Sequence, residues 1–174
     1  RANVGVGVRA SYLSGQRLPD VLERFVRDHP QASKKLASGE VLAVMRGLVP
    51  AGGTAGSIQK GNMILAGDAA GHVLATSGGG IPLAVVAGRI AGQSALDYLQ
   101  VGTPLQEYIS RIGQEFGREL ERSVQIRKMV DVAMRSDRLI NALFAALSPE
   151  QMKSVMRAQI PSPLKSRDWS GGDR

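Results

Sequence analysis

The sequence predicts a mixed α/β fold (α+β) that ends in an all-helical region, and three patterns carry this prediction. Valine and glycine alternate over residues 2–10, which is typical of a strand. A short apolar run at 63–67 ends at Asp68 and leads through small residues into a helix. After Thr103 and Pro104, apolar residues recur only at helical spacing. We therefore divide the 174 residues into four regions: 1–50, 51–102, 103–160 and 161–174.

Region 1–50 is predicted to contain the end of a sheet and a connecting helix. The strand at 2–10 has its valines on one face and glycines on the other, which permits close approach of another group. Residues 17–30, "RLPDVLERFVRDHP", have helical spacing, and Pro30 is expected to end this helix. Residues 39–50, "GEVLAVMRGLVP", predict one or two further strands.

Region 51–102 is predicted to be a strand–loop–helix unit. A glycine-rich loop at 51–62 precedes the short buried strand, and the helix runs from Gly79 to about Leu99. This helix is rich in alanine and glycine, so we expect it to pack tightly on at least one side.

Region 103–160 is predicted to be helical, with an irregular tail at 161–174. One stripe steps by three and four residues through Ile109, Ile112, Phe116, Leu120 and Val124. The same pattern recurs at 136–147. Ser148 then begins a capping box, with proline at the first helical position and Gln151 reaching back.

Composition limits the chemistry that the chain can perform. It has no cysteine, which excludes disulfides, thiolate metal ligands and a cysteine nucleophile. Its two histidines, His29 and His72, lie far apart without a carboxylate-rich neighbourhood, so we predict no metal site and a structural role for His29 at a helix end. The net charge of +7 is spread along the chain, and aromatic residues make up only 4%, so we predict no nucleic-acid partner.

No apolar run reaches the roughly 18 residues that span a bilayer, and no signal peptide is recognisable. The chain begins at Arg1 with a strand pattern already under way, from which we expect a carboxyl-terminal segment of a longer protein. A targeting signal can then lie outside this segment. We expect a cytoplasmic protein that can associate with a membrane.

The most informative stretch is "ILAGDAAGHVLATSGGGI" at residues 64–81. Asp68 follows a predicted strand, at the edge where ligands bind in open α/β folds. Three glycines at 78–80 then begin a helix, whose first amides lack intrahelical acceptors and favour an anionic or electron-rich ligand. Either feature alone is typical of a turn. Together they indicate a nucleotide-like cofactor with both hydroxyl and anionic groups.

The stretch "GDAAGHVLATSGGGIPLAVVAGRIAGQSAL" at 67–96 resembles the second flavin-binding motif of FAD-dependent oxidoreductases built like glutathione reductase and para-hydroxybenzoate hydroxylase. It is most similar to their geranylgeranyl reductase family, and "NVGVGV" at 3–8 resembles a strand of that family. The resemblance covers about residues 2–100. It implies that region 1–50 ends the substrate-domain sheet and that 51–102 is the second half of a Rossmann-like FAD-binding domain.

The resemblance also implies roles for individual residues. Asp68 accepts a hydrogen bond from a ribityl hydroxyl of FAD. Close approach of the flavin's phosphate and ribityl portion is permitted by Gly67, Ala69 and Gly71. Backbone N–H groups at the N1/O2 side of the isoalloxazine come from Gly79, Gly80 and Ile81. His72 lies in the loop under the ring and is a weak candidate for contact with flavin or substrate, and for proton supply.

The activity implied is reduction of isolated carbon–carbon double bonds in a prenyl chain, on a lipid or a pigment, by hydride from reduced flavin. The external reductant, NAD(P)H or ferredoxin, is not identified by the sequence. One alternative keeps the flavin and changes the chemistry, to a related monooxygenase or an electron-transfer quinone oxidoreductase. Another is a basic helical module that binds a membrane or a partner without flavin.

Several features of the family are absent from the chain. The look-alike "GVGVRA" at 5–10 lacks the acidic residue that a dinucleotide fingerprint needs about 20 residues later, and an aromatic substrate motif is missing. Ala75 stands where many relatives have proline. We therefore expect the chain to supply one wall of a flavin site, completed by the upstream half of the same protein. Alone, it is expected to bind no FAD and to be inactive.

Basic side chains stand between the apolar stripes of residues 104–160: Arg111, Arg118, Arg122, Arg127, Lys128, Arg135, Arg138, Lys153 and Arg157. Such a pattern is typical of a solvated helical face. In a family with lipid-bound substrates, it is also compatible with peripheral contact to anionic headgroups.

Overall fold

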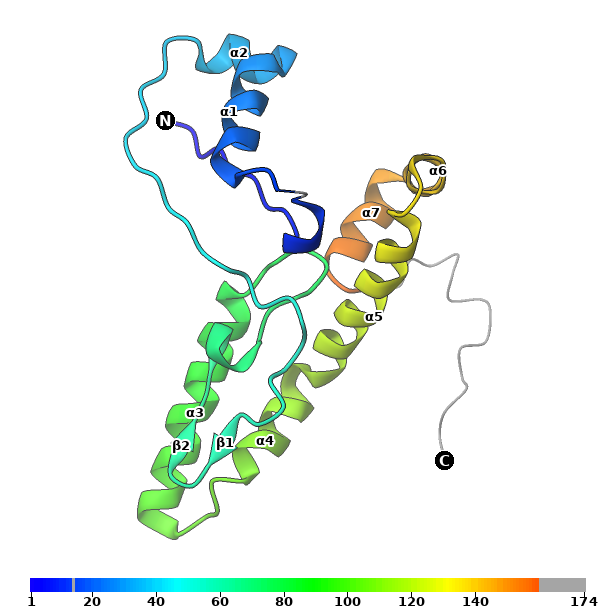
Figure 1. Cartoon of the computed structure of the whole chain (residues 1–174). Coiled ribbons are helices and arrows are strands. Elements are labelled where there is room, and N and C mark those ends of the chain that lie inside the picture. Colours follow the sequence, from blue (N-terminus) through cyan, green and yellow to red (C-terminus); the bar gives the residue numbers. More distant parts are fainter. Residues whose placement is uncertain (14, 160–174) are drawn as a thin grey trace. The chain divides into compact units, whose positions relative to one another are not determined.

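The computed structural model describes residues 1–13 and 15–159, which form a mostly helical chain with one two-stranded sheet (Figure 1). The chain divides into two compact units, Arg1–Gly47 and Leu48–Arg174. The predicted mixture of helix and strand is thus confirmed at the level of class. A Rossmann-like domain, which requires a larger parallel sheet, stays a prediction. The predicted tail at 161–174 lies outside the described residues.

The unit Arg1–Gly47 contains a 3₁₀ turn, Ala10–Tyr12, and two helices, α1 (Leu18–Asp28) and α2 (Pro30–Leu36). Helix α1 confirms the predicted helix. Pro30 does more than end it, because this proline is also the first residue of α2. The structural role of His29 is confirmed: its Nδ1 accepts hydrogen bonds from the Gln31 and Ala32 amides, both at 3.3 Å.

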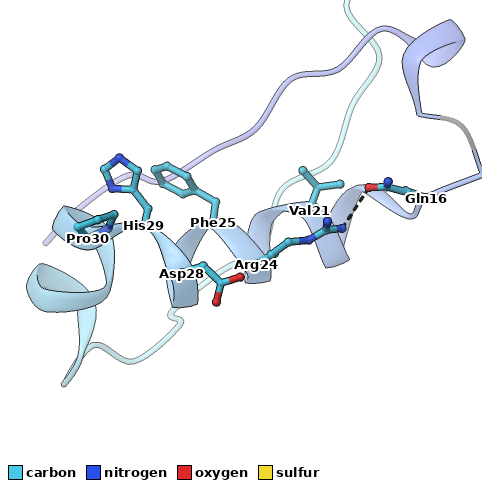
Figure 2. A pocket seen from close by; sticks show the side chains of 7 residues that line it. All are labelled: Gln16, Val21, Arg24, Phe25, Asp28, His29 and Pro30. Atoms are coloured by element: carbon cyan, nitrogen blue, oxygen red, sulfur yellow. Dashed lines mark hydrogen bonds between the residues drawn. The ribbon is translucent and has the colours of Figure 1, made fainter.

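An open groove of about 460 Å³ lies along α1 and the start of α2 (Figure 2). Arg24 donates to the Gln16 side chain across it at 3.1 Å, and the rings of Phe25 and His29 stack with centroids 4.9 Å apart. The side chain of Phe25 is 43% exposed. The groove therefore has an apolar floor but little depth, and it shares no residue with the predicted site.

The predicted strands at 2–10 and 39–50 do not form. Residues 39–50 have no regular secondary structure, and their apolar side chains face solvent, Met45 at 89% and Leu48 at 97% exposure. The physical reason is pairing: a strand satisfies its amides and carbonyls through a neighbouring strand, and the described part of the chain offers none here.

In the unit Leu48–Arg174, an antiparallel hairpin pairs β1 (Gln59–Lys60) with β2 (Met63–Ile64). The predicted buried strand at 63–67 is therefore shorter than expected and partly exposed. A buried strand needs a neighbouring strand on each side, whereas the described chain supplies one short neighbour, β1. The backbone continues into a 3₁₀ turn, Gly67–Ala70, and a loop that leads to the long helix α3 (Ile81–Val101).

Helices dominate the described residues that follow α3 in this unit, as predicted, and Figure 1 shows them in yellow-green to orange. Helix α4 (Glu107–Ile112) continues through a π-helical turn, Gly113–Gly117, into α5 (Arg118–Ala133). Then come α6 (Asp137–Ala146) and α7 (Pro149–Met156). The capping box is confirmed: the Ser148 hydroxyl accepts from the Gln151 amide at 3.3 Å, and the Ser148 amide donates to the Gln151 side chain at 2.8 Å.

The core of this unit lies where α3 packs against α4 and the π-helical turn. Its buried members are Ile58, Ala70, Ala87, Ile90, Tyr108, Ile112, Phe116 and Leu120. The Tyr108 hydroxyl donates to the Leu65 carbonyl at 2.7 Å, and burial raises the pKa of this phenol. This bond holds the chain that leaves β2 and so fixes the position from which the 3₁₀ turn begins.

Candidate functional site

The site begins at the 3₁₀ turn that contains Asp68. The Asp68 carbonyl accepts from the Gly71 amide at 3.0 Å, and the Gly67 carbonyl accepts from the His72 amide at 3.0 Å. The main chain closes the turn, and the carboxylate of Asp68 accepts no hydrogen bond from the residues that the structure describes. The simple alternative, in which this side chain caps a turn, is therefore not supported. The carboxylate is exposed and available to a ligand.

Backbone conformation and packing within the chain explain why residues 67 and 71 are glycine. Both are left-handed, at φ +65° and +72°. A Cβ on Gly67 would lie 3.2 Å from the Ala84 Cβ, and one on Gly71 would lie 2.2 Å from the Gly53 carbonyl oxygen. These glycines let the turn pack against α3 and the preceding loop. Their predicted role toward a flavin stays a prediction, as does that of Ala69, which is exposed.

The start of α3 forms the other side of the site. Gly80 is its N-cap, and Pro82 occupies the first turn. The Gly79 amide donates to the Ser77 hydroxyl at 3.3 Å, so it is partly satisfied inside the loop. The amides of Gly80 and Ile81 donate to no residue within 1–13 or 15–159. They are the donors that a ligand at this helix start can use.

Asp68 and the start of α3 lie together. The space that a Cβ on Gly80 would occupy is 3.0 Å from the Asp68 Oδ1 and 3.0 Å from a methyl group of Val73. Any larger residue at position 80 would press on the carboxylate. The structure thus places an exposed carboxylate against bare helix-start amides, a pairing that suits a ligand with a hydroxyl group and an electron-rich group. The residues present fit the ribityl chain and ring edge of a flavin.

His72 is fully buried in the loop between the turn and α3. Its ring meets that of Phe116 edge to face, with centroids 5.2 Å apart. Neither ring nitrogen has a hydrogen-bond partner in the described part of the chain. Burial lowers the pKa of His72, which favours the neutral imidazole.

Two residues that the sequence did not single out hold this loop. The Ser123 hydroxyl of α5 is fully buried and accepts from the Ala75 amide at 3.0 Å. The Thr76 hydroxyl donates to the Met156 carbonyl of α7 at 3.0 Å. The sequence contained one signal for Ser123. It is a polar residue directly before Val124, which belongs to the predicted apolar stripe.

No protein-family model matches the sequence, and no solved structure gives a significant match. Curated relatives do match. Digeranylgeranylglycerophospholipid reductase of Methanocella arvoryzae is 29% identical over 96% of this chain and 42% of its own length. Digeranylgeranylglycerophospholipid reductase 2 of Methanopyrus kandleri is 31% identical over 91% of the chain and 41% of its own. The protein of that name in Methanothermobacter thermautotrophicus is 30% identical over 95% and 41%.

The chain belongs to the geranylgeranyl reductase family. This confirms the resemblance that was first carried by the stretch at residues 67–96, and extends it over nearly the whole chain, helical region included. The chain spans about two fifths of the length of the curated relatives it matches.

Two further features bear on partners and ligands. No helix among the described residues is long and apolar enough to cross a membrane. Within the same residues, no group of three or more histidine, aspartate or glutamate side chains is placed to hold a metal ion.

Proposed function

We propose that this chain forms one wall of an FAD site in a reductase that saturates the prenyl double bonds of geranylgeranyl lipids. The observation that carries the proposal is the exposed Asp68 carboxylate beside the unpaired amides of Gly80 and Ile81. Its support in sequence is the match to proteins named digeranylgeranylglycerophospholipid reductases. The lipid named there defines the substrate class that we propose.

The residues of the wall have distinct proposed roles. Asp68 accepts a hydrogen bond from a ribityl hydroxyl, and the amides of Gly80 and Ile81 face the electron-rich edge of the ring system. Gly79 contributes less than expected from sequence, because its amide already has an acceptor. Gly67, Ala69 and Gly71 have a small side chain or none, so that the ligand can approach the main chain of the turn.

Bound FAD, once reduced by the external reductant, would supply the hydride that one carbon of the double bond accepts, and a proton would be added to the other carbon. The chain's own contribution is electrostatic: the helix start favours negative charge by about 0.3–1 kcal/mol from its dipole alone. Its amides are fixed before any ligand arrives, so little reorganisation is needed. His72 stays a candidate for a contact near the ring, and its lowered pKa indicates a neutral hydrogen-bonding group at pH 7.

The remainder of the longer polypeptide is the proposed partner of the open face of α3. Ile81, Val85 and Leu99 are between 69% and 80% exposed there, whereas Ala87, Ile90 and Ser94 are the buried residues of this helix. We propose that this remainder also binds the rest of the cofactor. The external reductant, NAD(P)H or ferredoxin, stays open.

A peripheral membrane contact is proposed for the helical end of the chain. Leu139 and Phe144 of α6 are each 55% exposed, close in sequence to the exposed Arg135 and Arg138. Apolar side chains beside cationic ones suit a bilayer surface with anionic headgroups, where each close cation contributes about 1 kcal/mol.

The test uses the complete protein that carries this chain. We expect a yellow preparation that dithionite bleaches and that, once reduced, saturates geranylgeranyl chains on a glycerophospholipid. Reoxidation by oxygen that is independent of prenyl lipid, with a hydroxylated product, would favour the monooxygenase alternative. A colourless protein that binds vesicles would favour the flavin-free module.

A further inference from the structure

The loop at residues 71–80 has little to hold it in place by itself. Four of its ten residues are glycines, and glycine loses more backbone freedom on folding than any other residue. Its internal bonds are short-range: the Leu74 and Gly79 backbones pair at 3.0 Å, the Ser77 and Gly78 amides donate to the Leu74 carbonyl, and two further bonds link residues two positions apart. The loop nevertheless determines where α3 begins, and therefore where the bare amides lie relative to Asp68.

Helix α5 anchors the middle of this loop. The Ala75 amide donates to the Ser123 hydroxyl at 3.0 Å, and the same hydroxyl donates to the Leu120 carbonyl one turn earlier at 2.7 Å. Donating to its own helix fixes the direction of the Ser123 hydroxyl, so its lone pairs point toward the loop. Ser123 is completely buried and Ala75 is half-buried, so this hydrogen bond is shielded from water on the side of α5.

Two weaker contacts flank this anchor on either side along the loop. The His72 ring packs on Phe116, and the Thr76 hydroxyl donates to the Met156 carbonyl at 3.0 Å. Successive parts of the loop are thus attached to the π-helical turn, to α5 and to α7. Of these attachments, the bond to Ser123 is the hydrogen bond made by a fully buried side chain.

We propose that Ser123 is a positioning residue for the cofactor site: it holds the loop at 71–80 and thereby sets the start of α3 against Asp68. The helical region then has a task in cofactor binding. The part of this inference that concerns the cofactor rests on the proposed function. The part that concerns the loop does not.

The experiment compares Ser123→Ala with Ser94→Ala in the complete protein. Ser94 is a matched control because it is also a buried helical serine, 4% exposed, whose hydroxyl accepts from Arg111 at 3.3 Å rather than from the loop. Hydrogen exchange of the peptide covering 72–80 is measured without added FAD. We expect roughly tenfold faster exchange in Ser123→Ala, the effect of losing one partly buried hydrogen bond, and no change there in Ser94→Ala.

The second readout is the bound flavin. Ser123→Ala is expected to weaken FAD binding roughly tenfold and to shift the visible absorption of the bound ring, while Ser94→Ala leaves both unchanged. Equal behaviour of the two variants in exchange and in flavin properties would overturn the proposal, as would faster exchange with an unaltered flavin. Wild-type protein without flavin would instead refute the proposed function, and the exchange result would still decide whether Ser123 holds the loop.

Thr76→Val provides an independent variant if Ser123→Ala does not fold. It removes the solvent-exposed bond to Met156 with almost no change in side-chain volume. We expect about threefold faster exchange of the same peptide and a similarly small loss of FAD affinity. Unchanged exchange in this variant would count against anchoring of the loop by the helices.

Discussion

The two units of the chain have equally regular apolar patterns but differ in what those patterns contact. In Arg1–Gly47 no described residue is buried, and Val21 and Phe25 of α1 line an open groove. In Leu48–Arg174 the same kind of pattern closes over a core that contains Tyr108, Phe116 and Leu120. The difference teaches that apolar periodicity is enough to predict a helix, whereas burial of its apolar face requires another segment that packs against it. For the second unit that partner lies within the described chain.

The largest expected difference between the units comes from one substitution made in both. Gly71→Ala is expected to destabilise the second unit by about 4 kcal/mol, because the left-handed residue would place a Cβ 2.2 Å from the Gly53 oxygen. Gly15→Ala is also left-handed, at φ +78°, but has nothing within 4 Å, and should cost about 1 kcal/mol. Urea denaturation combined with hydrogen exchange of peptides from each unit measures both. Equal costs would show that the contact with Gly53 is not rigid.

Truncation of one large side chain in each unit is expected to have the next largest effect. Leu120→Ala removes a side chain that is 1% exposed and should cost about 3 kcal/mol. Phe25→Ala removes one that is 43% exposed and should cost about 1 kcal/mol in the same assay. If the two losses are similar in the complete protein, α1 is covered there by another part of the polypeptide, and the contrast between the units belongs to this chain alone.

A smaller effect is expected on membrane binding. Replacing Arg135 and Arg138 together by alanine should weaken association with phosphatidylserine vesicles roughly thirtyfold at low salt, from about 1 kcal/mol for each cation. Replacing Lys34 and Lys35 of α2 by alanine removes the same charge from the first unit and is expected to have little effect. Vesicle sedimentation, with phosphatidylcholine vesicles for comparison, distinguishes the pairs. Identical losses would indicate attraction by net charge alone.

The smallest effect concerns pH. Burial lowers the pKa of His72, so below about pH 6.5 the unfolded chain binds a proton that the folded chain does not. The stability of the second unit is therefore expected to decrease as the pH falls from 7 to 5 and to stay level above that window. His72→Leu should remove this part of the decrease, while His29→Leu, at the exposed α2 cap, serves as the control. Urea denaturation at each pH would contradict the account if His72→Leu left the slope unchanged.

The sequence was most informative where a local pattern determines local structure. Helix α1, helix α3 and the capping box at Ser148 could be predicted because spacing and cap residues act within a few positions. The strands at 2–10 and 39–50 failed for the opposite reason, since a strand depends on a distant partner. The π-helical turn at Gly113–Gly117 leaves no sign in a pattern of threes and fours.

The residues of the candidate site could also be predicted only where local sequence determines them. Asp68 and the glycines before α3 could be singled out because a strand end and a helix start are visible in sequence. That Gly67 and Gly71 are needed by packing inside the chain could not be predicted, because their neighbours Ala84 and Gly53 are 17 and 18 positions away. The same holds for Ser123, which lies 48 positions from the Ala75 amide that it binds.

The most direct test of the central claim is the flavin content of the complete protein after Asp68→Ala, measured beside Asp137→Ala. Asp137 is a matched control, since it is also an exposed carboxylate at the start of a helix, α6. We predict that Asp68→Ala binds FAD tenfold to roughly a hundredfold more weakly, the loss expected of one charged hydrogen bond, and that Asp137→Ala retains wild-type affinity. Full flavin occupancy and unchanged affinity in Asp68→Ala would contradict a cofactor wall built from this carboxylate and the amides of α3.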